Sequence, residues 1–222
     1  PLHLANTFYL LALADLMSVY NRQRSAGFIF NAGLWIGLGS LFYLSVFIFI
    51  LLAFVALRIL RPFDLRERLM VLLGVLTPYL LTGLYFFWFG RFDYFVAQQF
   101  SQPLAYLDFQ PAPPAWLTYS KLGLFAVMLS IVIFSHNRYL TKKTIQVQKK
   151  INVLFWGLLC AGLSLLFQPA LQLDHLLLLG LPMGLLLAVN FTALRPALAS
   201  LLHLLLVLIA LILQYRHFLF DI

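Results

Sequence analysis

Runs of about 20 apolar residues recur along most of this chain, and they constrain its fold more than any other feature. Hydrophobic residues fill 63% of the 222 positions and charged residues only 10%, whereas a soluble domain is about half apolar and a quarter charged. One water-facing surface cannot cover so large an apolar excess. The composition therefore excludes a soluble enzyme, a disordered chain and a disulfide-stapled secreted module. It predicts an all-α, polytopic bundle of transmembrane helices.

The apolar runs also predict how many segments enter the membrane, since a spanning helix needs roughly 20 apolar residues. The candidate runs are Leu2–Tyr20, Ala26–Leu60, Leu69–Phe89, Trp116–Ser135, Ile151–Phe167, His175–Ala193 and Ala197–Gln214. The second run is too long for one span, and Gly37, Gly39 and Ser40 predict that it breaks there into a hairpin of a short and a full-length helix. We expect one transmembrane domain over residues 1–222, with about eight membrane segments.

The basic residues predict which way these segments point. Twelve of the 15 lysines and arginines fall on one face of the predicted bundle, and the positive-inside rule makes that face cytoplasmic. These twelve are Arg22, Arg24, Arg58, Arg61, Arg66, Arg68, Arg138, Lys142, Lys143, Lys149, Lys150 and Arg195. The start of the chain then lies outside the cell. We therefore expect further residues upstream of Pro1, so that the domain is incomplete at its N-terminus.

Several residues predict local features of the helices. Asp64 can cap a helix that starts at Leu65, and Pro78 should kink that helix. Asp15 lies inside the first apolar run, where it is either solvated near the cytoplasmic face or functional. Two pairs of glycines stand four residues apart, and each pair allows a close helix contact or an oligomer seam. These pairs are Gly33 with Gly37 and Gly180 with Gly184.

The outer connection, residues 90–115, is the least ordinary part of the chain. Its apolar residues Phe92, Phe95, Val96 and Phe100 follow helical spacing, which predicts a helix lying in the membrane interface with its aromatic face in lipid. The simpler interpretation is an interfacial anchor. The alternative is one wall of a cavity open to the outer leaflet, in which Arg91 could grip a phosphate and Asp93 could orient it or act as a base.

The basic cytoplasmic connection, residues 136–150, suits contact with anionic lipid headgroups. The residues predicted to make this contact are Arg138, Lys142, Lys143, Lys149 and Lys150. Membrane topology alone would also place basic residues on this face. The dispersed histidines and the single Cys160 predict no metal site and no cofactor. Nucleic acid is excluded as a partner because the basic residues lack a folded soluble platform.

Three stretches in the first ninety residues resemble a family of uncharacterised multi-spanning inner-membrane proteins from Bacteroidota. They are residues 1–6 (PLHLAN), 26–43 (AGFIFNAGLWIGLGSLFY) and 60–67 (LRPFDLRE). The rest of the chain shares only hydropathy with that family, which has no activity to carry over. The resemblance implies a location in the bacterial inner membrane, crossed several times.

The chain is also similar in pattern to the GT-C glycosyltransferases, whose repeating hairpins pair a glycine-bearing short helix with a full span ending in arginines. Those enzymes move a sugar from a polyprenyl-phosphate donor at the outer face. Their acidic catalytic residue lies on a first outer loop that would precede Pro1, so no residue of this chain inherits that role. The resemblance implies a transferase, or a degenerate relative, in which Arg91 binds the phosphate and Lys121 adds charge. Tyr94 or Gln98 would then contact sugar hydroxyls.

The sequence leaves two functions open. The first is this GT-C-like transferase, with membrane lipids and polyprenyl phosphate as partners, and it predicts a lipid-lined groove that reaches Arg91. The alternative is a non-catalytic subunit or scaffold of a larger cell-envelope complex, which predicts co-purification with other membrane proteins. A transporter ranks below both, because the polar residues cluster at the ends of the spans rather than at mid-membrane.

Overall fold

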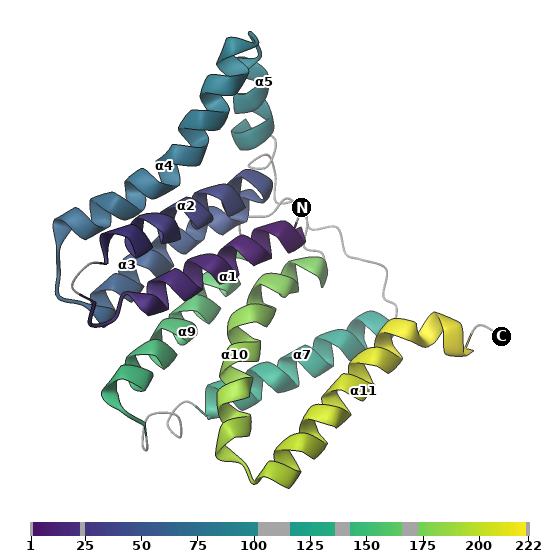
Figure 1. Cartoon of the computed structure of the whole chain (residues 1–222). Helices are drawn as coiled ribbons and strands as arrows, with labels where there is room; N and C mark the ends of the chain where they lie inside the picture. The colour runs from purple at the N-terminus through teal and green to yellow at the C-terminus, as the bar shows by residue number, and fades with distance from the viewer. Residues whose placement is uncertain (1, 23–24, 102–115, 136–142, 166–172, 221–222) are drawn as a thin grey trace. The chain divides into compact units, whose positions relative to one another are not determined.

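The chain is helical throughout the residues that its computed structural model describes, which are 2–22, 25–101, 116–135, 143–165 and 173–220 (Figure 1). No strand occurs in those ranges, which confirms the all-α prediction for them. The chain divides into two compact units. The first unit comprises residues 1–110 and 143–182, and the second comprises residues 111–142 and 183–222. Each unit is described here by itself.

The first unit holds most of the helices. These are α1 (Leu2–Ser18), α2 (Ala26–Phe42), the 3-10 helix η1 (Leu44–Ile48), α3 (Phe49–Leu60), α4 (Leu65–Trp88), α5 (Phe92–Val96), the π-helical η2 (Ala97–Ser101), α9 (Ile145–Ser164), the 3-10 helix η4 (Leu173–Leu176) and the start of α10 (Leu177–Ala193). The second unit contains the rest of α10 together with α7 (Trp116–Phe134) and α11 (Pro196–Phe220).

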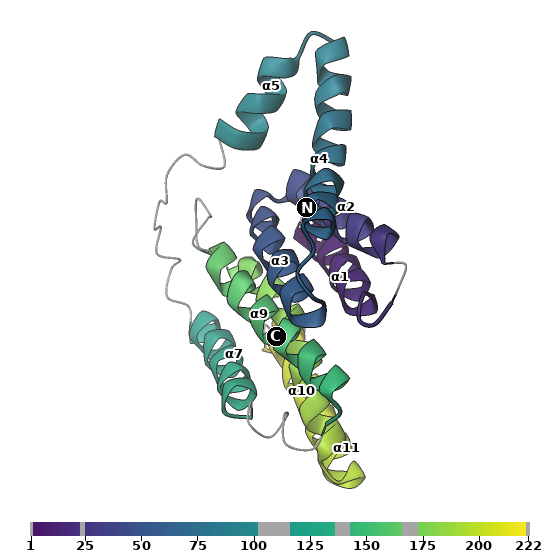
Figure 2. The same ribbon diagram turned by 90° about the vertical axis from the view of Figure 1, so that its left-hand side faces the viewer.

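Helix α2 is central to the first unit, because it packs against both α1 and α4. Helix α3 packs on α9, which lies beside it in Figure 2. The largest fully buried side chains of this unit include Tyr9 of α1 and Phe49 of α3, whose rings stack with their centroids 3.9 Å apart. Gly157 of α9 leaves room for the Tyr9 hydroxyl, which would lie 2.9 Å from a Cβ at that position. Aromatic stacking and a missing side chain thus join three helices.

The contact between α2 and α4 is built on glycines from both helices. A Cβ at Gly33 would lie 2.3 Å from the carbonyl oxygen of Val71, and a Cβ at Gly74 would lie 2.3 Å from that of Phe30. Gly37 faces Val75 and Pro78 in the same way. The two backbones therefore approach as closely as they do only because these positions lack side chains.

The predicted break at Gly37, Gly39 and Ser40 is wrong, because α2 runs through all three residues and ends at Phe42. The chain leaves the helix at Tyr43, whose backbone is extended. Gly39 faces Phe8 and Ala5 of α1, and Gly37 faces α4, so these small residues serve helix packing rather than a turn. The hairpin partner of α2 is correspondingly formed by η1 and α3.

The other glycine pair behaves differently. A Cβ at Gly180 or at Gly184 would meet no heavy atom within 4 Å, apart from its own helix backbone and chain neighbours. The predicted close helix contact at this pair is therefore not found in the described part of the chain, since α10 presents both positions to open space.

Helix α4 is the one helix of the described residues that is long and apolar enough to cross a membrane. Its 24 residues extend over about 36 Å, against about 30 Å for the hydrocarbon core of a bilayer. The Asp64 carboxylate accepts a hydrogen bond from the Arg66 N–H at 2.9 Å, which confirms the predicted cap. Figure 1 shows that α4 is bent, and Pro78 within it removes one backbone donor.

Candidate functional site

The turn after α4 determines where the predicted substrate-binding residues lie. Gly90 has a φ of +65°, and its N–H bonds the Phe87 carbonyl at 3.0 Å while the Arg91 N–H bonds the Phe86 carbonyl at 2.9 Å. This Schellman pattern ends the helix and reverses the chain. Helix α5 then runs back beside α4 (Figures 1 and 2).

The predicted aromatic face of this segment is only partly exposed, because one of its residues packs against α4. Phe95 is buried, and its ring stacks on Phe86 of α4 with centroids 5.4 Å apart. The polar residues Arg91, Asp93, Tyr94 and Gln98 are all exposed. Lys121 lies on α7 in the second unit.

A polar cluster that the sequence analysis missed lies where α5 and η2 return towards α2. The Tyr79 hydroxyl donates to Ser40 Oγ at 2.8 Å, and Ser40 Oγ donates to the Gly37 carbonyl at 2.8 Å. Gln99 Nε2 donates to the Ser40 carbonyl at 2.9 Å. We call Ser40, Tyr79 and Gln99 the Tyr79 cluster. These hydrogen bonds pair polar groups of α2, α4 and η2 with one another.

A second polar contact lies just beyond the end of α2. The Tyr43 hydroxyl hydrogen-bonds His175 Nδ1, and the two rings stack with centroids 5.6 Å apart. Tyr43 follows Ser40 by three residues, while His175 comes from η4, more than a hundred residues later. The sequence did not reveal this pair, because the two residues lie far apart in the chain and neither belongs to a motif.

An apolar cavity of about 450 Å³ adjoins the Tyr79 cluster. Its lining residues are Leu44, Ser45, Phe47, Ile48, Ile50, Leu51 and Phe100. Phe100 stacks on the Tyr79 ring at 5.9 Å and Phe47 meets that ring edge-on at 6.4 Å, so the cavity and the cluster share two walls. The volume lies within the range of about 300–1,000 Å³ typical of small-molecule sites.

The structure separates this cavity from the polar residues that the sequence predicted as ligands. Arg91, Asp93, Tyr94 and Gln98 are not among its lining residues. Of the two adjacent glutamines, Gln99 turns inward to Ser40 while Gln98 is exposed. Of the described residues of the outer connection, 90–101, Phe100 is the one that lines the cavity.

We expect Tyr79→Phe to lower the free energy of unfolding by about 0.5–1.5 kcal/mol, the usual net value of one hydrogen bond. The ring and its contacts with Phe47 and Phe100 remain, so the loss is that of the hydroxyl and its hydrogen bonding within the Tyr79 cluster. Thermal unfolding of the detergent-solubilised chain measures the change. Tyr85→Phe is the control, because Tyr85 is exposed on the same helix. Equal effects of both variants would contradict a role for the cluster in stability.

Asp15, the ionisable residue of the first apolar run, has a specific partner in the structure. The indole N–H of Trp35 on α2 donates to its Oδ2 at 3.0 Å, and the Asp15 side chain is half-buried. Its carboxylate therefore fastens α1 to α2. The sequence suggested neither Trp35 nor this contact.

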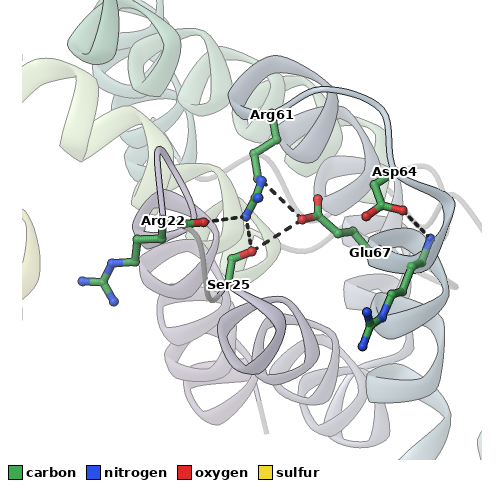
Figure 3. A network of polar contacts seen from close by, with 6 residues as sticks. Arg22, Ser25, Arg61, Asp64 and Glu67 are labelled. Carbon is green, nitrogen blue, oxygen red and sulfur yellow. Dashed lines mark hydrogen bonds and ion pairs between the residues drawn. The ribbon is translucent and has the colours of Figure 1, made fainter.

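At the C-terminal end of α3, a polar network joins the α1–α2 connection, the α3–α4 connection and the first turn of α4 (Figure 3). Arg61 Nη1 donates to the Arg22 carbonyl at 3.0 Å and to Ser25 Oγ. Arg61 Nε pairs with Glu67 Oε1 at 3.2 Å, and Ser25 Oγ donates to the same oxygen at 3.5 Å. We call Ser25, Arg61 and Glu67 the Arg61 network. It ties the turn after α1 to the end of α3 and the start of α4.

The residues predicted to contact lipid headgroups are only partly described. Arg138 and Lys142 lie outside the described residues, whereas Lys143 is exposed and Lys150 is half-buried. The ammonium group of Lys149 lies 5.4 Å from the centroid of the Tyr20 ring. Among the described residues, no group of three His, Cys, Asp or Glu side chains could hold a metal ion.

Comparisons of the chain with protein-family models, with curated proteins and with solved structures found no match. The chemistry open to the site therefore follows from its lining. Aliphatic and aromatic walls of this kind can hold a hydrocarbon chain.

Proposed function

We propose that this chain is a multi-spanning membrane protein that binds the hydrocarbon chain of a lipid-linked substrate in the apolar cavity. The observation that carries the proposal is the cavity itself, in which Ser45 is the one polar residue among the described lining residues. A pocket so apolar discriminates in favour of an alkyl or isoprenoid chain and against a soluble metabolite.

Membrane insertion is supported by composition and by exposure. Large apolar side chains cover the outer half of α4, where Leu81, Phe87 and Trp88 are 65%, 68% and 83% exposed. Lipid removes the penalty of leaving such a surface uncovered in water. The inner membrane, the multiple crossings and the cytoplasmic position of the basic residues belong to this proposal.

The substrate class follows from the position of polar groups beside the cavity. Tyr43, which precedes the lining residue Leu44, is hydrogen-bonded to His175, and the Tyr79 cluster lies behind Phe47 and Phe100. A long apolar chain with a polar head suits this layout. Polyprenyl phosphate, the donor class of the GT-C-like enzymes, is such a molecule, and we propose it as the substrate class.

Filling the cavity provides the test. In Ile48→Trp a larger side chain occupies the volume, and we expect labelling of the full chain by a photoactivatable polyprenyl phosphate to fall about tenfold, which corresponds to roughly 1.4 kcal/mol of binding. The control is Leu80→Trp, since Leu80 is exposed on α4 and does not line the cavity. Mass spectrometry of the labelled wild-type chain should place the adduct on the residues around η1.

Equal labelling of the two variants, or an adduct distributed over the exposed face of α4, would overturn the proposal. The non-catalytic subunit would then be the surviving hypothesis. Size-exclusion profiles of both variants in detergent show whether a loss of labelling is a loss of folding instead.

A further inference from the structure

A second cavity, of about 310 Å³, lies at the end of α3 opposite the apolar cavity. Its lining includes Tyr20, Arg22, Leu60, Arg61, Pro62 and Lys149. These residues come from the turn after α1, the end of α3 and the first part of α9. We call this space the cationic cavity, because among its described lining residues Arg22, Arg61 and Lys149 are basic and none is acidic.

The Arg61 guanidinium is held in place at this cavity. Its Nε and Nη1 atoms bond Glu67, Ser25 and the Arg22 carbonyl, and a guanidinium has five N–H donors. The two N–H groups of Nη2 are therefore left over from the network. Figure 3 shows the Arg22 carbonyl facing Arg61 while the Arg22 guanidinium points away, towards the ring of Phe28 at 4.6 Å.

Lys149 is a second positive charge at this cavity, and it lies outside the Arg61 network. Its ammonium group lies over the Tyr20 ring, and it forms no ion pair with a carboxylate of the described residues. Glu67 offsets the charge of Arg61, and the Arg22 guanidinium points away towards Phe28, so Lys149 supplies the excess of positive charge at the cavity. An aromatic platform under an ammonium group keeps the charge in position without cancelling it.

We propose that the cationic cavity binds the phosphate group of an anionic ligand, with Lys149 as the unpaired cation and Arg61 as a positioned hydrogen-bond donor. Arginine and lysine together are the usual partners of phosphate in proteins. The site goes beyond the general contact predicted for the basic connection, because it selects Lys149 over its neighbour Lys150. It is independent of the function proposed for the apolar cavity.

A lipid headgroup and a soluble phosphate share this chemistry. The cavity lies where the apolar helix α3 gives way to Arg61 and Pro62, a position suited to a membrane surface. A dissolved phosphate compound could reach the same groups from water. The experiment below separates the two sources.

The test compares three variants of the full chain by native mass spectrometry in detergent, with phosphatidic acid as the probe and phosphatidylcholine as the neutral reference. We expect Lys149→Gln to weaken binding of phosphatidic acid about tenfold, the loss that follows from removing one charged hydrogen bond. Lys149→Arg keeps the charge and should stay within about threefold of the wild type. Lys150→Gln is the matched control, because it removes the same charge from the adjacent residue, which does not line the cavity.

Addition of excess inorganic phosphate identifies the source. Phosphatidic acid that stays bound assigns the site to a lipid headgroup, and phosphatidic acid that is displaced assigns it to a soluble phosphate compound. Either result supports a phosphate site when the difference between Lys149→Gln and Lys150→Gln is present. Equal losses in these two variants would show diffuse surface attraction and overturn the proposal, as would equal binding of the two lipids. Thermal unfolding of each variant without lipid separates a binding defect from a folding defect.

Discussion

Gly33→Ala should lower the free energy of unfolding by about 3 kcal/mol, at the upper end of the usual cost of overpacking a core. The new Cβ would lie 2.3 Å from the Val71 carbonyl oxygen and 3.1 Å from the carbonyl carbon. Both atoms belong to the backbone of α4, so no side-chain rotation relieves the clash. The helices must separate, and the reciprocal contact between Gly74 and Phe30 is lost with them.

Gly27→Ala is the matched control on the same helix, because a Cβ there would meet nothing within 4 Å. Alanine is favoured over glycine in helices by about 0.5–1 kcal/mol, so this variant should be neutral or slightly more stable. The midpoint of thermal unfolding in detergent compares the two. A Gly33→Ala protein as stable as Gly27→Ala would contradict the close approach of α2 and α4.

The second large effect is expected from Arg61→Met, which should cost about 2–4 kcal/mol of stability. Arg61 and Glu67 are only 22% and 12% exposed at their side chains, so removing the guanidinium leaves a carboxylate partly desolvated and unpaired. The Arg22 carbonyl and Ser25 hydroxyl also lose their donor. The control is Arg58→Met, since Arg58 is exposed in the last turn of α3, just before Arg61, and lies outside the network, and we expect a change within about 0.5 kcal/mol.

The double variant Arg61→Met with Glu67→Gln distinguishes pairing from packing. Once the orphaned carboxylate is neutral, we expect part of the lost stability to return, so the two changes should be less than additive. Strict additivity would mean that the charges do not interact, and the Arg61 network would then be held by its hydrogen bonds alone.

Local chemistry explains what the sequence predicted correctly. The cap at Asp64 depends on residues two positions apart, and the bent helix around Pro78 depends on a missing N–H. The apolar runs likewise locate the helices, although within the run from Ala26 to Leu60 α2 extends past the predicted break and α3 is shorter than the predicted full-length helix. These features need no knowledge of what packs against them.

The wrong helix break, and the contacts that the sequence did not reveal, occur where a distant helix determines the outcome. Glycines at positions 37 and 39 favour a break in an isolated helix. Here α4 packs against position 37 and α1 against position 39, and these close contacts stabilise the helix because the glycines have no side chains. Gln98 and Gln99 are indistinguishable by composition, and only the return of η2 to Ser40 selects the second. Tyr43 and His175, or Lys149 and Tyr20, lie too far apart in sequence for any local pattern to pair them.

The reversal at Gly90 has a consequence for the reach of a bound molecule. Between Tyr79 and Trp88 the helix rises about 14 Å, and Arg91 and Asp93 are the only charged residues from Tyr79 to Ser101. The doubled-back segment thus forms a finger whose charge is confined to its tip, while its base borders the apolar cavity. A compact ligand can occupy one of these places, whereas a ligand that touches both must be extended along the finger.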